Sequence, residues 1–250
     1  MKEKIADLKN KFIENTDNVR IILINQTREF ESFYDDQTEL FNNHFPFVQD
    51  PYYDLRNHEQ IVLQSFYKAH TLLFTSYKLL LDGNYGASNM LIRGVFEYLL
   101  VGKYFSVKKD PALSDKWLTG SNFDVYDKAI KCLQTQQKQA FHEFWRICCN
   151  DNHAMTHSLQ IGFDISDKTD DIRETFSRLV IMQICCYHLL SSHIINNRLK
   201  YRSEFYGRHK NRNSELKASI AVNIMHLKAR IAPIGHKLIG NYKAKWTFTR

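Results

Sequence analysis

Residues that interrupt helices are scarce in this chain, which has nine Gly and four Pro among 250 residues. The long stretches between them repeat apolar side chains every three or four positions, the period of an α-helix with one buried face. Hydrophobic residues make up 44% of the chain and charged residues 24%, which are ordinary values for a protein with a full core. We therefore predict an all-α fold, an antiparallel helical bundle with long helices and a basic C-terminal segment.

Apolar spacing and turn residues together predict where the helices begin and end. The polar and glycine-rich run at 82–86 separates two strongly apolar stretches, which predicts a helical hairpin. Asp110 and Pro111 predict a helix start, because Pro suits a first helical turn. In the first part of the chain, helices are expected over 2–42 with a break near 15–18, over about 55–81 and 87–105, and over a short stretch from 111. Pro46 and Pro51 mark the first connection. Further on, we expect two or three helices within 124–158, one that is capped at Asp170 or Asp171 and runs to about 196, and one over 213–231.

The net charge of +7 is concentrated at one end of the sequence. Residues 198–250 contain 13 Lys and Arg but only two Glu, a balance of +11, whereas residues 1–197 contain 21 Lys and Arg and 25 Asp and Glu, a balance of −4. We therefore divide the chain into a helical body, residues 1–197, and a basic C-terminal helix and arm, residues 198–250, which we expect to pack on the same domain.

The basic segment also contains aromatic residues, and cations follow phosphates while aromatic rings stack on bases. This pattern indicates a contact with RNA or another polyanion. The alternative is a solvated basic helix and an arm that docks on the acidic body. The candidate nucleic-acid-binding residues are Arg198, Lys200, Arg202, Arg208, Lys210 and Arg212.

The five cysteines include no Cys-x-x-Cys spacing, so zinc-ribbon and thioredoxin-like sites have no support. Adjacent cysteines within apolar runs are typical of small core residues in a reducing compartment. The charged N-terminal residues do not resemble a signal peptide. The most apolar run, from about Leu179 to Ile195, contains polar residues that favour a buried helix over a membrane span. We expect a cytoplasmic protein without membrane contact.

Sequence patterns typical of cofactor and metal sites are absent, since the chain has no Gly-x-Gly-x-x-Gly, Walker A, Gly-x-Ser-x-Gly or His-Glu-x-x-His pattern. None of the eleven His follows a Glu by three positions, which excludes the ferritin-like di-iron pattern. An acidic cluster between Asp164 and Glu174 is compatible with a cation site but more typical of a solvated loop before a helix. We predict no cofactor and no metal ligand.

Two groups of polar residues interrupt otherwise apolar stretches. The first is Arg93 with Glu97, whose spacing puts both side chains on one helix face, with Asn89 one turn earlier. Such charges need polar partners, so the pair must face a cleft, an interface or a buried network. Because Arg binds phosphate or carboxylate in bidentate fashion, Arg93, Glu97 and Asn89 are our candidate substrate-binding residues. The alternative is a structural pair that ties two helices together.

The second group is Arg146 followed by His153 and His157. The two His share a face if a helix continues there, but the spacing supplies no third metal ligand. Alternatively Arg146 binds phosphate while His153 acts as acid or base, a role suited to a pKa near neutrality. We take Arg146, His153 and His157 as candidate catalytic residues. The structural alternative is a pair of hydrogen-bonded interface histidines.

Residues of about 60–160 resemble a group of uncharacterised bacterial helical proteins, with a Gly-x-Tyr turn at 83–85, an Arg-x-x-x-Glu helix at Arg93 and Glu97, and a later His segment at 152–158. That group resembles, more remotely, the HEPN superfamily of bacterial defence and toxin systems. Many HEPN members are metal-independent RNases that use Arg-x(4–6)-His in a composite dimer site, and others only bind. The resemblance implies a homodimer that acts on RNA, or a non-catalytic helical module that binds nucleic acid or a partner protein in a defence assembly.

The Arg-x(4–6)-His spacing occurs three times, whereas composition alone produces about 1.7 such pairs. HEPN RNases usually carry a polar residue directly after the Arg. Ser203 after Arg202 fits this pattern, and Ile147 after Arg146 departs from it. We choose Arg146 with His153 because that segment carries the wider resemblance. The three pairs are Arg146/His153, Arg202/His209 and Arg230/His236.

Overall fold

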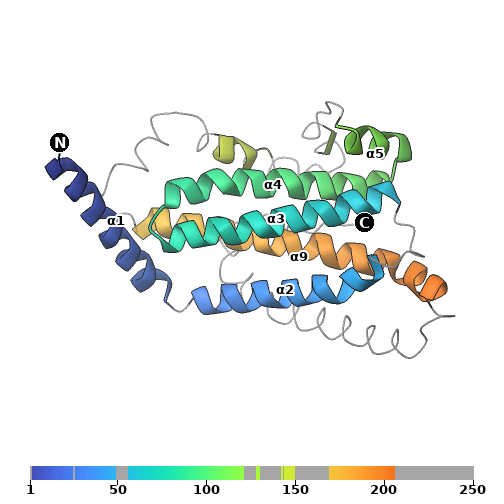
Figure 1. The fold of residues 1–250 in the computed structure, drawn as a ribbon, viewed down its shortest axis with the longest axis horizontal. Coiled ribbons are helices and arrows are strands. Elements are labelled where there is room, and N and C mark those ends of the chain that lie inside the picture. Colours follow the sequence, from blue (N-terminus) through green and yellow to red (C-terminus); the bar gives the residue numbers. More distant parts are fainter. Residues whose placement is uncertain are drawn as a thin grey trace.

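The computed structural model describes residues 2–24, 26–48, 56–120, 128–129, 142, 144–149 and 169–205 (Figure 1). Every regular element in these ranges is a helix, which confirms the all-α prediction. A short helical stretch covers residues 144–149. The labelled helices are α1 (Lys2–Leu23), α2 (Thr27–Val48), α3 (Asn57–Leu81), α4 (Tyr85–Lys108), α5 (Pro111–Leu118) and α9 (Thr169–Phe205).

Helices α2, α3, α4 and α9 lie side by side as a bundle, and α1 projects from one end of it at an angle (Figure 1). α3 runs antiparallel to α4 across a tight turn. α9 runs in the same direction as α4, because Asn89 bonds to Thr175 near the start of both helices and Gly102 lies against Leu189 further along. The core contains the apolar faces predicted for α3 and α4, including Ile61, Val62, Phe66, Ile92, Val95 and Phe96.

The turn between α3 and α4 is set by its glycine and its cap. Gly83 has a φ of 74°, and a Cβ there would lie 2.9 Å from the backbone nitrogen of Thr16. Any other residue is therefore disfavoured both by the left-handed backbone conformation and by the lack of space for a side chain. Asn84 caps α4 by accepting a hydrogen bond from the Ala87 amide at 3.2 Å. Thr16 donates to the carbonyl of Asp82 at 3.1 Å, which joins α1 to the turn.

Three helices meet closely around Gly102 of α4. A Cβ at this position would lie 2.6 Å from Leu189 Cδ2 on α9 and 3.0 Å from Ser65 Cβ on α3. The missing side chain therefore permits the α3–α4–α9 packing on which the core depends.

The structure corrects the predicted break in the first helical stretch. Residues 15–18 are helical, and α1 continues through Val19 to Leu23, both fully buried. A helix tolerates polar residues where it faces solvent or a neighbouring turn, so this polar run does not end α1. The break falls between Leu23 and Thr27. Pro46 lies in the last turn of α2 rather than in a connection.

Helix α9 is longer than predicted at both ends. It begins at Thr169, so Asp170 and Asp171 lie in its first turn instead of capping it, where carboxylates still favour the helix dipole. It continues to Phe205, well beyond 196, and passes without interruption through the predicted boundary after residue 197. Within the described ranges, no helix is both long and apolar enough to cross a membrane. The helices predicted within 124–158 lie largely outside the described residues, and that predicted at 213–231 lies wholly outside them.

Candidate functional site

Arg93 and Glu97 form the ion pair that their spacing predicts. Arg93 Nε lies 2.9 Å from Glu97 Oε1, and the two side chains are 29% and 46% exposed. The guanidinium carbon of Arg93 also lies 5.1 Å from the centre of the Trp145 ring, a cation–π distance. Arg93 is therefore held between a carboxylate and an indole at the surface of α4.

The stretch of residues 144–149 packs on α4 next to this pair. The ring of Phe96 lies 5.0 Å from that of Phe144 and 5.9 Å from that of Trp145. Cys148 is buried, whereas Arg146 is exposed. The two predicted polar groups are separated by about fifty positions in the sequence, yet Arg93 contacts the residue directly before Arg146.

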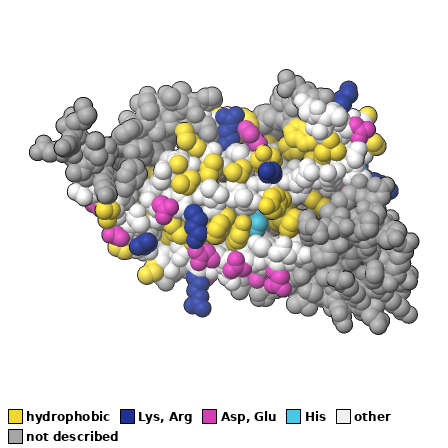
Figure 2. All heavy atoms as spheres, viewed as in Figure 1, with side chains coloured by type: hydrophobic (Ala, Val, Ile, Leu, Met, Phe, Trp, Pro, Cys, Tyr) yellow, Lys and Arg dark blue, Asp and Glu magenta, His cyan; other side chains and the backbone are white. Residues whose placement is uncertain are grey.

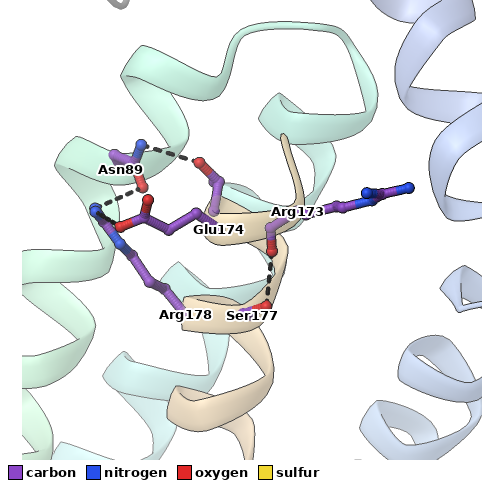
Figure 3. A network of polar contacts seen from close by, with 6 residues as sticks. Asn89, Arg173, Glu174, Ser177 and Arg178 are labelled. Atoms are coloured by element: carbon purple, nitrogen blue, oxygen red, sulfur yellow. Dashed lines mark hydrogen bonds and ion pairs between the residues drawn. The ribbon is translucent and has the colours of Figure 1, made fainter. Parts of the chain in front are cut away.

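Asn89 makes its contacts with α9 (Figure 3). Its amide nitrogen donates to Thr175 Oγ1 at 3.0 Å, and its amide oxygen accepts from an Arg178 guanidinium nitrogen at 3.2 Å. Arg178 also pairs with Glu174 at 2.5 Å, and only 11% of its side chain is exposed. Asn89 therefore joins α4 to α9 and does not share the Arg93–Glu97 pair.

Sequence reasoning did not single out Arg178, although Glu174 and Arg178 have the same four-residue spacing as Arg93 and Glu97. Figure 3 shows Arg178 directed at Asn89, while Arg173 of the same helix points away from the network. Arg93 on α4 and Arg178 on α9 thus each have a carboxylate partner on their own helix, which compensates the charge of the largely buried Arg178.

A buried histidine on α3 was also missed, because nothing in one sequence records its neighbours on α2. Thr38 lies 2.9 Å from His70 Nε2 and donates to the carbonyl of Tyr34, so Nε2 carries the ring proton. The Tyr34 ring stacks on His70 at 3.8 Å, and Nδ1 has no hydrogen-bond partner among the described residues. Burial lowers the pKa of His70 to about 3.

The described cysteines bear out the prediction of core residues. Cys148, Cys185 and Cys186 are buried, and Cys149 is partly buried. Burial raises the pKa of the Cys185 and Cys186 thiols, so neither is an activated nucleophile.

Several predicted site residues cannot be located. His153, His157, Arg208, Lys210 and Arg212 lie outside the described residues. Arg198, Lys200 and Arg202 lie on α9, but their side chains are not described. Among the side chains that are described, no group of three His, Cys, Asp or Glu is placed to hold a metal ion.

The fold and the site define a class, an all-α bundle with an arginine–carboxylate pair on α4 that contacts an indole from residues 144–149. Comparison of the chain with known protein families, with curated proteins and with solved structures finds no match.

Proposed function

We propose that this protein is an HEPN-like bacterial defence or toxin-type protein that acts on RNA as a metal-independent endoribonuclease. The observation that supports the proposal most directly is the 5.1 Å contact between Arg93 and the Trp145 ring. It brings the Arg-x-x-x-Glu helix against the segment that begins the Arg146–His153 motif. The Arg146 side chain is exposed, and a guanidinium that is open to solvent suits the binding of a phosphodiester.

In the proposed reaction, the 2′-hydroxyl of one nucleotide attacks the adjacent phosphorus while the bond from phosphorus to the 5′-oxygen breaks. His153 removes the proton from the hydroxyl, and a second acid, for which His157 is the candidate, protonates the leaving oxygen. Arg146 holds the phosphate, and Arg93, oriented by Glu97, supplies a further cation. The products are a 2′,3′-cyclic phosphate and a 5′-hydroxyl.

The test is cleavage of single-stranded RNA by the full-length protein in the presence of a metal chelator. His153→Ala is expected to lower the rate by about 100-fold or more, the usual contribution of an acid or base. His142→Ala is the matched control, because His142 is exposed and lies just before the same motif. Equal rates for wild type and His153→Ala would refute the assignment, and no cleavage of any RNA by the wild type would refute the activity.

A second candidate function is a non-catalytic module that binds nucleic acid or a partner protein through residues 198–250. It is favoured by the +11 balance of that segment, which starts within α9. Replacing Arg198, Lys200 and Arg202 together with Gln should weaken RNA binding and lower the salt slope of the binding constant by about 2. Unchanged affinity and slope would exclude this surface.

We further propose a cytoplasmic homodimer. Ile13 and Ile21 of α1 are exposed by 56% and 72%, and Ile24, directly after α1, is exposed by 69%. A second copy of the chain is the occupant we propose for these three side chains. Light scattering should give a dimer for the wild type and a monomer for Ile21→Glu. A monomeric wild type would refute the proposal.

A further inference from the structure

A groove of about 910 Å³ lies where α2, α3, α4 and α5 meet, and its size is within the range of small-molecule sites. Hydrophobic side chains gather on this face along α3 and over α4 beside α5 (Figure 2). Tyr98, which lines the groove, lies on α4, the helix that also carries Arg93 and Glu97. The described lining residues are Phe41, Asn42, Gln60, Ile61, Leu63, Gln64, Ser65, Tyr67, Lys68, Tyr98 and Trp117.

Four aromatic rings contribute to this lining. Tyr67 is 55% exposed and Tyr98 is 36% exposed, while Phe41 and Trp117 are partly buried against the core. The Phe41 and Tyr67 rings lie 6.1 Å apart. Rings that are fixed at the base and open to solvent offer stacking faces to a planar ligand, and every nucleobase has such a face.

The polar groups of the groove suit the edges of a base and its phosphate. Gln60, Gln64 and Asn42 supply amides that both donate and accept, as the edges of unpaired bases require. Lys68 is exposed and is the one charged side chain among the described lining residues. Because the described lining contains this cation and no carboxylate, the groove favours an anionic ligand.

We propose that this groove binds an unpaired nucleobase and its phosphate, by stacking on the aromatic rings and by pairing with Lys68. The inference deepens the proposed function, since it names where bases of a single-stranded RNA lie relative to Arg93. A free nucleotide offers the same chemistry, so the ligand source has to be distinguished by experiment.

The test uses the full-length protein and a fluorescent single-stranded 2′-O-methyl oligoribonucleotide, which cannot be cleaved through its 2′-oxygen. Tyr67→Ala should weaken binding by about fivefold or more, whereas Tyr67→Phe keeps the ring and should bind like the wild type. Lys68→Gln should reduce the salt slope by about 0.7. Lys78→Gln is the matched control, because Lys78 lies on the same helix outside the lining and is likewise exposed.

If a mononucleotide displaces the labelled oligonucleotide, a free nucleotide is a sufficient ligand. If only the oligonucleotide binds, the ligand is single-stranded RNA. Either result supports the proposal if the Tyr67 and Lys68 variants show the expected losses. Wild-type affinity in Tyr67→Ala and Lys68→Gln, equal losses in Lys78→Gln, or no binding of either probe would overturn it. Because cleavage is not measured, these outcomes are independent of the His153 test.

Discussion

Acidification from about pH 7 to about pH 5 is expected to destabilise the protein through His70. Its folded pKa is about 3, because the ring is buried between Tyr34 and Phe66, whereas an unfolded His has a pKa of about 6.5. Below about pH 6.5 the unfolded chain therefore binds a proton that the folded chain does not. The contribution of the neutral His70 to the unfolding free energy is therefore fully present above that pH, and it is lost as the pH falls toward 3.

The size of the effect follows from the same two values. The loss at about pH 5 is roughly 2 kcal/mol, and its limit below pH 3 is roughly 5 kcal/mol. The physical cause is that a proton on Nδ1 would create a buried donor, and Nδ1 has no hydrogen-bond partner among the described residues. Nε2 already donates to Thr38, so the charge has no compensation there.

The assay is urea unfolding followed by circular dichroism at both pH values, for wild type and His70→Phe. The phenyl ring preserves stacking on Tyr34 and removes the titrating group, so the variant should lose about 2 kcal/mol less than the wild type between the two pH values. His142→Phe, at an exposed position, should keep the wild-type dependence. Carboxylates contribute little to the pH dependence of the unfolding free energy above about pH 5. The other histidines contribute equally to the wild type and to His70→Phe, so their effect cancels when the two proteins are compared. Parallel pH dependences for wild type and His70→Phe would refute the reasoning.

Three further predictions concern helix α4. Gly102→Ala should lower the unfolding free energy by about 1–3 kcal/mol, because the new methyl would lie 2.6 Å from Leu189 Cδ2. Gly86→Ala should raise the unfolding free energy by about 0.5–1 kcal/mol, because a Cβ at Gly86 meets no neighbouring side chain within 4 Å and Ala favours a helix over Gly. Urea denaturation of both variants measures the contrast. Asn89→Ala should cost about 2 kcal/mol in the same assay, because it removes the hydrogen bonds that Asn89 makes to Thr175 and Arg178. Arg93→Gln should change stability by less than about 1 kcal/mol yet weaken RNA binding in a titration, because its ion pair is partly exposed.

The elements that sequence reasoning located well are those with two independent signals. α3 and α4 combine a strong apolar period with a Gly-containing turn, and α5 combines Asp110 as a side-chain cap with Pro111. The first stretch has the period alone, so its break was assigned to the polar run at 15–18 rather than after Leu23. Local polarity could not show that Thr16 has a partner in the α3–α4 turn.

The candidate site was predictable only where the partners lie on one helix. The spacing of Arg93 and Glu97 predicts their contact. The contact of Arg93 with Trp145, by contrast, depends on how residues 144–149 pack on α4. The same limit applies to His70, whose environment comes from α2. Tertiary neighbours of this kind follow from packing, which no periodicity in a single chain records.

Helix α4 carries residues of both the packing contacts and the proposed RNA-binding sites. Its Asn89 is buried against α9, its Arg93 is half-buried against Trp145, and its Tyr98 borders the groove. Because consecutive residues of a helix turn by about 100°, these positions face different neighbours along one rigid backbone. A helix packed against both α3 and α9 holds its side chains in fixed positions, as a binding site requires. Loss of RNA affinity in Arg93 or Tyr67 variants that unfold like the wild type would therefore indicate lost contacts with the ligand rather than a displaced helix.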